Sequence, residues 1–161
     1  MTRDRILVIK LASLGDFVQA FGPIAAIRAH HPGAEITLLT TPPYAELAWR
    51  SPWFDEVWTD GRPAWTDLRG LWRLARRLRA AGFRRVYDLQ TSGRSSRYRL
   101  FVGPGVEWSG IARGASHPHR NPLRDSLHTV ERQREQLEQA GIRDFPPPDL
   151  SFLDDDTSGL G

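Results

Sequence analysis

The clearest chemical potential lies in the loop Ala12-Ser13-Leu14-Gly15-Asp16, which follows a short apolar run and ends in a carboxylate. A carboxylate at the mouth of a sheet can accept a proton from an incoming hydroxyl, which is the task of a general base. Asp is also a favoured N-cap, because its oxygen accepts from backbone N–H groups of a first helical turn. The helix N-terminus lowers the pKa of such a carboxyl, whereas enclosure raises it. The residues are compatible with either role.

Other motifs with known chemistry are absent or incomplete. The sequence has no G-x-G-x-x-G dinucleotide fingerprint, no P-loop and no H-E-x-x-H motif. It has no cysteine, which excludes thiol catalysis and cysteine-ligated zinc. His117 and His119 offer two imidazoles without a further ligand nearby, so we interpret them as loop residues and expect no metal site.

Positive charge is concentrated in one part of the chain. Of the 22 basic residues, only Lys10 is a lysine, and residues 62–99 hold eleven arginines against Asp67 and Asp88. Planar guanidinium groups suit phosphates and carboxylates, so this region is suited to a polyanion such as a phosphorylated lipid, a nucleotide or a nucleic acid. A nucleotide-composition bias in the source would explain the arginine excess equally well.

The hydrophobic pattern predicts the elements that position these groups. The run Arg5 to Lys10 is apolar almost throughout, as in a strand buried on both faces of a parallel sheet. We predict further strands over 35–40, 56–59, 85–89 and 106–111, and helices over 16–30, 44–50, 65–81, 94–101 and 129–140. Pro23 is expected to kink the first helix. The alternation indicates an α/β fold with a Rossmann-like doubly wound parallel sheet.

In such sheets, ligands bind outside the carboxyl ends of the strands, near a reversal in strand order. The loops after Lys10, Leu89 and Ile111 are therefore the places to look. Residues 1–143 are predicted to form this domain. Residues 144–161 hold five aspartates, three consecutive prolines and no basic residue, which predicts a linker or tail.

The 161 residues suffice for one buried core without a disulfide. The longest apolar stretch, Ala20 to Ile27, is far below the roughly 18 residues that a bilayer span needs. The apolar run after Arg5 is too short for a secretory signal. We therefore expect a cytoplasmic protein.

Several segments, in their order and spacing, resemble glycosyltransferase family 9, the heptosyltransferases of lipopolysaccharide core assembly. No single segment is specific, and the resemblance covers about residues 5–142. The matching segments are Ile6-Leu7-Val8-Ile9-Lys10, Ser13-Leu14-Gly15-Asp16, Pro23, Ala26-Ile27-Arg28, Tyr87-Asp88-Leu89-Gln90, Arg94-Ser95, Ser109-Gly110-Ile111, Arg120-Asn121-Pro122-Leu123 and His128-Thr129-Val130-Glu131-Arg132.

The resemblance implies the N-terminal half of a GT-B glycosyltransferase, the half that takes the acceptor. The family is inverting and metal-independent, and it transfers heptose from an ADP-sugar to the inner core on lipid A. Asp16 would be the general base, and inversion by one in-line displacement needs no enzyme nucleophile. The nucleotide sugar would be a co-substrate, so no resident cofactor is expected.

The implied acceptor contacts are Ser13, Gly15, Gln90, Ser95, Arg120, His128 and Arg132. Charge-assisted pairs from Arg120, His128 and Arg132 would suit the acidic Kdo and phosphate groups of the acceptor. Gln90 and Ser95 have an alternative role in ordering the loop after their strand. His128 and Arg132 have the alternative of a solvated helix start.

Family members are about twice as long as this chain, with a donor-binding half after a Pro-rich linker. We therefore expect a truncated gene product or lone acceptor-binding half, which lacks the C-terminal donor-binding domain and is inactive alone. The expected partners are an inner-core acceptor of the Kdo-lipid A type, that missing domain and the cytoplasmic face of the inner membrane. The Arg-rich stretch 65–81 would supply the membrane contact, although it is equally compatible with an ordinary amphipathic helix.

Two rival functions remain. One is a non-catalytic module that binds a phosphorylated glycan or another polyanion, in which Asp16 only caps a helix. Nucleic acid is not the expected partner, because no reading motif appears. The other rival is a GT-B enzyme with a different acceptor, which would not need Arg120 and Arg132.

Overall fold

The computed structural model describes residues 3–12 and 14–153. Within these residues, six parallel strands form a single sheet in the order β3-β2-β1-β4-β5-β6. The strands are β1 (Arg5–Ile9), β2 (Glu35–Leu39), β3 (Glu56–Trp58), β4 (Arg85–Asp88), β5 (Glu107–Gly110) and β6 (His117–Pro118). This order confirms the predicted Rossmann-like doubly wound sheet, and it reverses between β1 and β4.

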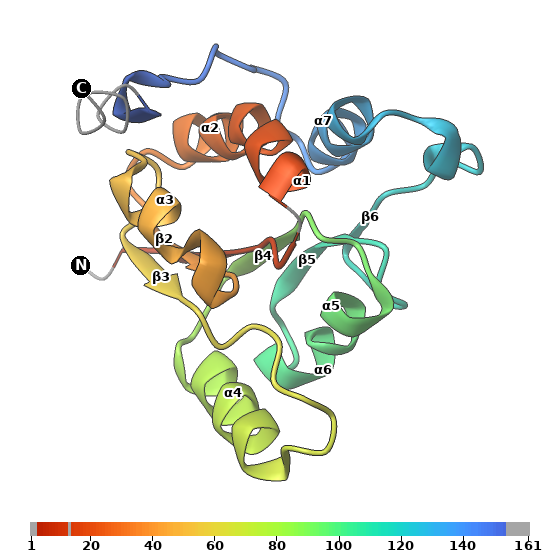
Figure 1. Cartoon of the computed structure of the whole chain (residues 1–161). Helices are drawn as coiled ribbons and strands as arrows, with labels where there is room; N and C mark the ends of the chain where they lie inside the picture. Colours follow the sequence, from red (N-terminus) through yellow and green to blue (C-terminus); the bar gives the residue numbers. More distant parts are fainter. Residues whose placement is uncertain (1–2, 13, 154–161) are drawn as a thin grey trace.

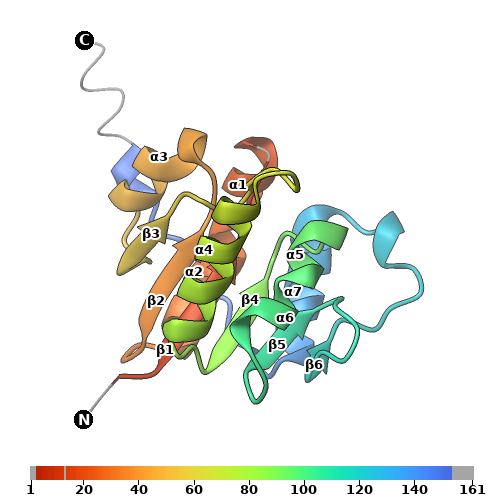
Figure 2. The ribbon, with the colours of Figure 1, turned by 90° about the horizontal axis from the view of Figure 1, so that it is seen from below.

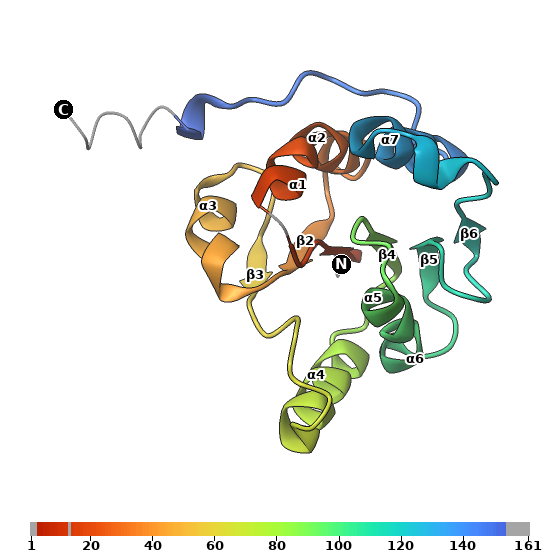
Figure 3. The same cartoon turned by 45° about the vertical axis from the view of Figure 1, so that its right-hand side comes forward.

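Helices cover both faces of the sheet (Figures 1 and 2). One layer holds α1 (Leu14–Gln19), α2 (Phe21–His30), α3 (Ala45–Arg50) and α7 (Thr129–Gln139). The other layer holds α4 (Leu68–Ala80), α5 (Gly93–Arg97) and α6 (Arg99–Val102), and Figure 3 shows the two layers on opposite sides. Short 3₁₀ turns cover Pro42–Tyr44 and Arg124–Ser126.

The central strand β1 contributes to both cores, because successive side chains of a strand point to opposite faces. Ile6 and Val8 belong to the core under α1, α2 and α7, whereas Leu7 and Ile9 belong to the core under α4 and α6. Since both faces are covered, the run has no alternation in polarity, as expected for a buried parallel strand.

Pro23 divides the predicted helix over 16–30 rather than merely kinking it. A proline cannot donate to the carbonyl four residues earlier, and its ring clashes with that carbonyl. For Pro23 this carbonyl belongs to Gln19, where α1 ends. The division lets Pro23 lie in the first turn of α2, where its missing N–H costs nothing.

The long connection from β3 to α4 is held against α5 and α6. The Tyr98 hydroxyl donates to the Gly61 carbonyl at 2.7 Å, and Arg94 donates to the Pro63 carbonyl at 2.7 Å. A Cβ at Gly61 would lie 2.5 Å from the Thr40 carbonyl oxygen, so the loop needs glycine there. Asp67 then accepts from the Gly70 N–H and starts α4, three residues later than the predicted Trp65 start.

The segment after α7 runs back across α2 toward α3 (Figure 1). The Phe152 ring lies 5.6 Å from that of Phe21 and 5.4 Å from that of Trp53, measured between centroids. Phe145 and Leu153 pack against the same core. Part of the Pro- and Asp-rich segment that we expected to be a linker or tail is therefore an apolar strap on this helix layer.

We expect Phe152→Ala to lower the free energy of unfolding by about 3 kcal/mol, because it removes a buried aromatic ring. Phe152 is 8% exposed, whereas Leu150 in the same strap is 42% exposed. The matched control Leu150→Ala should therefore cost less than about 1 kcal/mol. Urea unfolding of both variants checks this, and equal small losses would mean that the strap does not pack as described.

Candidate functional site

The carboxyl ends of β1 and β4 meet where the strand order reverses. Ile9 of β1 is paired with Asp88 of β4, and Lys10 follows directly. Lys10 and Asp88 are both buried. Burial lowers the pKa of Lys10, the negative charges of Asp16 and Asp88 oppose that shift, and the positive charge of Arg132 adds to it. Lys10 thus interacts electrostatically with two carboxylates and an arginine from three separate elements, α1, β4 and α7.

Asp16 lies within the first turn of α1, because the helix begins at Leu14. Its side chain is therefore not the N-cap that one of our two interpretations assumed. Asp16 is partly exposed, and its charge acts on the ammonium of Lys10. The neighbouring Gly15 is exposed, and a Cβ built there would meet no described atom within 4 Å. The first turn of α1 therefore offers a carboxylate beside open space.

Gln90 shapes the loop that leads to Asp16. Its side-chain carbonyl accepts from the Leu11 N–H at 2.9 Å and the Ala12 N–H at 3.2 Å. From the other side, the Thr41 hydroxyl donates to the Leu11 carbonyl at 2.8 Å. Side chains from the loops after β2 and β4 therefore hold the backbone that follows β1 in place by hydrogen bonds. The Gln90 side chain thus orders the loop after β1 rather than the loop after its own strand, which was the alternative role that we considered.

Asp88 organises the loop after β4. One carboxylate oxygen accepts from the N–H groups of Gln90 and Thr91, and the other accepts from the Ser95 hydroxyl at 2.9 Å. Burial nevertheless raises the pKa of Asp88 to about 6, against the effect of these donors and of Lys10. Ser95 is fully buried and forms a capping box with Ser92 at the start of α5. Because Ser95 is buried and bonded to Asp88 and Ser92, it orders the loop after β4 and has no exposed side chain for an acceptor to contact.

Two arginines bring positive charge to this edge. Arg132 on α7 acts electrostatically on Lys10 and on Arg124, and Arg124 also interacts with Asp88. Arg124 donates from Nε to Nδ1 of His119 at 3.2 Å, and Nε2 of His119 pairs with Glu135 at 2.8 Å. The Nη2 atom of Arg124 is buried without a hydrogen-bond partner among the described residues. Arg124 therefore has donor capacity left to satisfy.

The structure separates Arg120 from this group. The backbone N–H of Arg120 donates to the Gln139 side chain, which is seven residues beyond Arg132 and so about 10 Å farther along α7. His128 is exposed at the N-terminus of α7, one turn before Arg132. Ser13 lies outside the described residues. Among the expected contacts that the structure describes, Arg132 acts on Lys10 as Asp16 does, and Gly15 is the exposed neighbour of Asp16 in the chain.

Sequence reasoning missed Lys10, Asp88 and Arg124 as site residues. A signal existed for two of them, because Lys10 and Asp88 directly end the two strands that flank the predicted reversal. Arg124 carried no such signal, since its approach to Arg132 depends on how the loop after β6 folds over α7. The resulting cluster holds three cations and two carboxylates: Lys10, Arg124, Arg132, Asp16 and Asp88.

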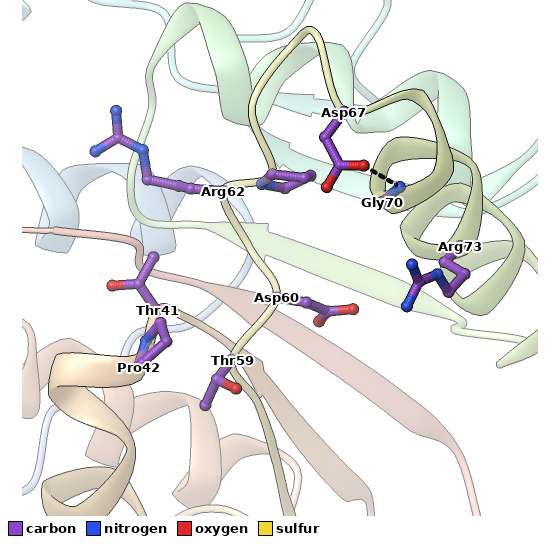
Figure 4. Close-up of a pocket in the computed structure, with 9 residues that line it drawn as sticks. Thr41, Pro42, Thr59, Asp60, Arg62, Asp67, Gly70 and Arg73 are labelled. Carbon is purple, nitrogen blue, oxygen red and sulfur yellow. Dashed lines mark hydrogen bonds between the residues drawn. The ribbon is translucent and has the colours of Figure 1, made fainter.

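An open pocket of about 350 Å³ lies at the same edge, beyond β2 and β3, and several charged side chains line it (Figure 4). Thr41, which also holds Leu11, connects it to the loop after β1. Asp60, Asp67 and Arg73 lie on one side of it in Figure 4, and Arg62 extends away from them. Charged groups of both signs thus continue along this edge.

Within residues 3–12 and 14–153, no group of three or more His, Asp or Glu side chains is arranged to hold a metal ion. None of the helices in that part of the chain combines the length and apolar composition needed to cross a bilayer.

The raised pKa of Asp88 predicts a specific pH dependence of stability. The folded pKa is about 6, above the ordinary value near 3.9, so the folded state binds this proton more tightly than the unfolded state. The contribution is fully present below about pH 4 and is lost as the pH rises through about 6. Asp88→Asn should abolish this contribution, because the amide does not titrate.

The measurement is urea unfolding of the wild type and Asp88→Asn at several pH values from about 4 to about 8, a range that runs from the unfolded-state pKa of Asp88 to above its folded-state pKa. The difference between their free energies of unfolding should fall as the pH rises. A comparison with the variant is needed because burial lowers the pKa of His31 to about 4, which gives the opposite trend in both proteins. A difference that stays constant would contradict the buried carboxylate.

No family model matches the sequence, and no curated protein matches it. Solved structures do match. The glycosyltransferase family 9 structure from Veillonella parvula DSM 2008 is 23% identical, with a TM-score of 0.73 over 91% of this chain and 44% of that one. E. coli ADP-heptose lps heptosyltransferase II is 22% identical, with a TM-score of 0.66 over 89% of this chain and 44% of its own.

E. coli heptosyltransferase WaaC, solved with ADP-2-deoxy-2-fluoro heptose, is 19% identical, with a TM-score of 0.65. The match covers 90% of this chain and 50% of WaaC. The chain thus spans half or less of the length of these structures. Its six-stranded parallel sheet with helices on both faces has the fold that they share over that part.

Proposed function

We propose that this chain is the acceptor-binding half of an inverting GT-B glycosyltransferase related to family 9. It would direct a heptose from an ADP-sugar to a hydroxyl of the lipopolysaccharide inner core. The observation that carries the proposal is the charged cluster around Asp16 at the strand-order reversal, in a fold shared with solved heptosyltransferases. Half-length coverage supports the assignment to one half of such an enzyme.

Asp16 is the proposed general base. Its carboxylate takes the proton of the acceptor hydroxyl while the hydroxyl oxygen attacks the anomeric carbon and the nucleoside diphosphate leaves from the opposite side. Lys10 supports this role, because its ammonium interacts electrostatically with Asp16. Open space beside Gly15 supports close approach of a sugar ring to Asp16.

Arg132 and Arg124 are the proposed anchors for the acidic acceptor. Together with Lys10 they provide three cations, which interact with the carboxylates of Asp16, Asp88 and Asp125. A carboxylate or phosphate of a Kdo-containing inner core would form charge-assisted pairs with these arginines. Ser13, Arg120 and His128 stay as predicted acceptor contacts.

The donor would be held by a second half. The solved WaaC structures contain ADP or an ADP-sugar analogue, and this supports an ADP-sugar as co-substrate. The reaction as proposed uses no metal and no resident cofactor. It would take place in the cytoplasm, at the membrane face that exposes the lipid-linked acceptor.

The acceptor-binding role is tested by calorimetric titration of this chain with a delipidated, phosphorylated, Kdo-containing inner-core oligosaccharide and, separately, with an ADP-sugar. We expect binding of the oligosaccharide alone. Arg132→Ala should weaken it by about 10- to 100-fold, as expected when a charge-assisted contact is lost. Arg143→Ala is the matched control, because Arg143 is exposed beyond the end of α7, and it should change the affinity little.

Binding of the nucleotide sugar alone, or equal effects of Arg132→Ala and Arg143→Ala, would refute the acceptor site. A circular dichroism spectrum of each variant separates loss of contact from loss of fold.

The catalytic role of Asp16 predicts a different pattern. Asp16→Asn should leave the oligosaccharide affinity within about twofold, because the amide preserves size and hydrogen-bonding capacity. When this half is joined to a donor-binding half, the same change should lower turnover by roughly 10²- to 10⁴-fold, since the amide cannot take the proton. The readout is the rate of ADP release with acceptor present.

Near-normal turnover would remove Asp16 from catalysis. Binding of the acceptor without any turnover, even with a donor-binding half attached, would instead favour the non-catalytic glycan-binding module.

A further inference from the structure

Four large apolar side chains stand exposed on adjoining elements outside the charged cluster. They are Trp65 at 43%, Leu68 at 74%, Trp72 at 60% and Leu100 at 71% exposure. Trp65 precedes α4, Leu68 and Trp72 lie on α4, and Leu100 lies on α6. We call them, with the arginines among them, the Trp-Arg surface; these arginines are Arg69, Arg73, Arg76, Arg97 and Arg99.

The elements that carry the Trp-Arg surface contact one another. Helices α4 and α6 lie side by side, and Arg79 of α4 donates to the Phe101 carbonyl of α6 at 3.4 Å (Figures 1 and 3). The guanidinium groups of Arg94 and Arg97, both on α5, lie 4.1 and 5.4 Å from the centre of the Trp65 ring. These contacts hold the turn before α4 against α5, so the exposed apolar side chains belong to elements that adjoin one another.

The core does not account for these apolar side chains. Helix α4 packs on the sheet through Leu74 and Leu78, which are fully buried. Leu68 and Trp72 are four residues apart, so they share a face of α4, and that face lies about 120° or more around the helix from Leu74. Arg76, one turn after Trp72, lies 5.2 Å from the centre of its ring. An apolar ridge therefore projects from an otherwise cationic helix.

The charge that this surface presents to solvent is positive. Residues 62–99 contain only two acidic residues, Asp67 and Asp88. Asp67 accepts from the Gly70 N–H at the start of α4, and Asp88 is buried behind Ser95 on the other side of the loop. A partner that complements this surface must therefore combine negative charge with a medium that receives Trp and Leu side chains.

We propose that the Trp-Arg surface docks on an anionic lipid bilayer. Indole rings suit the interface between headgroups and acyl chains, and leucines extend into the acyl boundary. The surrounding arginines contact lipid phosphates, and an anionic surface attracts them over a Debye length. A nucleic acid would use the arginines but would gain little from Leu68 and Leu100, so the apolar ridge favours lipid.

Docking in this way has a consequence for the charged cluster. Helix α4 begins beside the cavity that Asp67 and Arg73 line, at the same sheet edge as the cluster. A bilayer under the Trp-Arg surface would therefore lie close to that edge. This consequence rests on the proposed function, because it matters only if the acceptor is lipid-linked. The docking itself depends on neither Asp16 nor glycosyl transfer.

The test is sedimentation of this chain with sucrose-loaded vesicles of phosphatidylcholine alone or with phosphatidylglycerol added. We expect binding only when phosphatidylglycerol is present, and weaker binding at high salt. Trp72→Ser with Leu100→Ser should weaken it by about tenfold or more, because both apolar contacts with the membrane are lost. Trp49→Ser with Leu150→Ser is the matched control, since both residues are exposed elsewhere, and it should change binding little.

A second pair of variants tests the charge. Arg69→Gln with Arg76→Gln should weaken binding to phosphatidylglycerol vesicles, whereas Arg134→Gln with Arg143→Gln removes equal charge elsewhere and should not. All the substituted side chains are exposed, so folding is expected to survive, and circular dichroism checks it.

Three results would overturn the proposal. Equal binding to neutral vesicles would show adsorption without charge recognition. Loss of binding only in the Arg69/Arg76 variant, together with competition by single-stranded nucleic acid, would indicate a general polyanion surface. Sedimentation equilibrium showing a dimer that Trp72→Ser with Leu100→Ser dissociates would indicate a second copy. Because the vesicles carry neither acceptor sugar nor donor, these outcomes are independent of the glycosyltransferase tests.

Discussion

Burial of the Asp88 carboxylate where β4 ends is the constraint on which the rest of the site depends. A buried carboxylate must be satisfied by donors, and Asp88 obtains them from the Gln90 and Thr91 N–H groups and the Ser95 hydroxyl. Those bonds set the turn after β4, and the turn places the Gln90 side chain against the backbone of Leu11 and Ala12. The path of the chain toward Asp16 therefore follows from how Asp88 is satisfied.

The same carboxylate governs the local charge. Lys10 is buried at the end of the neighbouring strand, where an unpaired ammonium would be costly, and the negative charges of Asp16 and Asp88 oppose that cost. Arg124 and Arg132 approach from the loop after β6 and from α7, and they add positive charge near Lys10 and Asp88. An anionic ligand bound by these cations would lie beside Asp16. For that reason acceptor binding and base catalysis are proposed for the same site.

The two helix layers have different surfaces. The layer of α1, α2 and α7 carries the charged cluster at its edge, and the strap containing Phe152 covers part of it. The layer of α4, α5 and α6 leaves tryptophan and leucine side chains exposed among arginines. Helix α4 packs against the sheet through Leu74 and Leu78, so the side chains on its other side are available for contact with a partner.

Local pattern was sufficient to predict much of this protein. The uninterrupted apolar run of β1 indicated a strand covered on both faces. Pro23 indicated a disturbance of the first helix, although a kink was predicted and the helix is divided at Ala20. The alternation of elements led to the doubly wound sheet, and the carboxyl-end rule led to the loop containing Asp16. Two-residue β6 escaped prediction, because so short a strand has no period and exists only through its pairing with β5.

Other features arose only from long-range contacts. Whether Asp16 caps α1 depended on where that helix begins, and the approach of Arg124 to Arg132 depended on how the loop after β6 lies against α7. The roles of Gln90 and Ser95 depended on partners that no sequence period reveals. Sequence by itself determined the elements and the edge of the sheet where chemistry can occur, because periodicity and strand direction are local. The tertiary structure decided which charges meet there, because burial and electrostatic partners come from residues far apart in the chain.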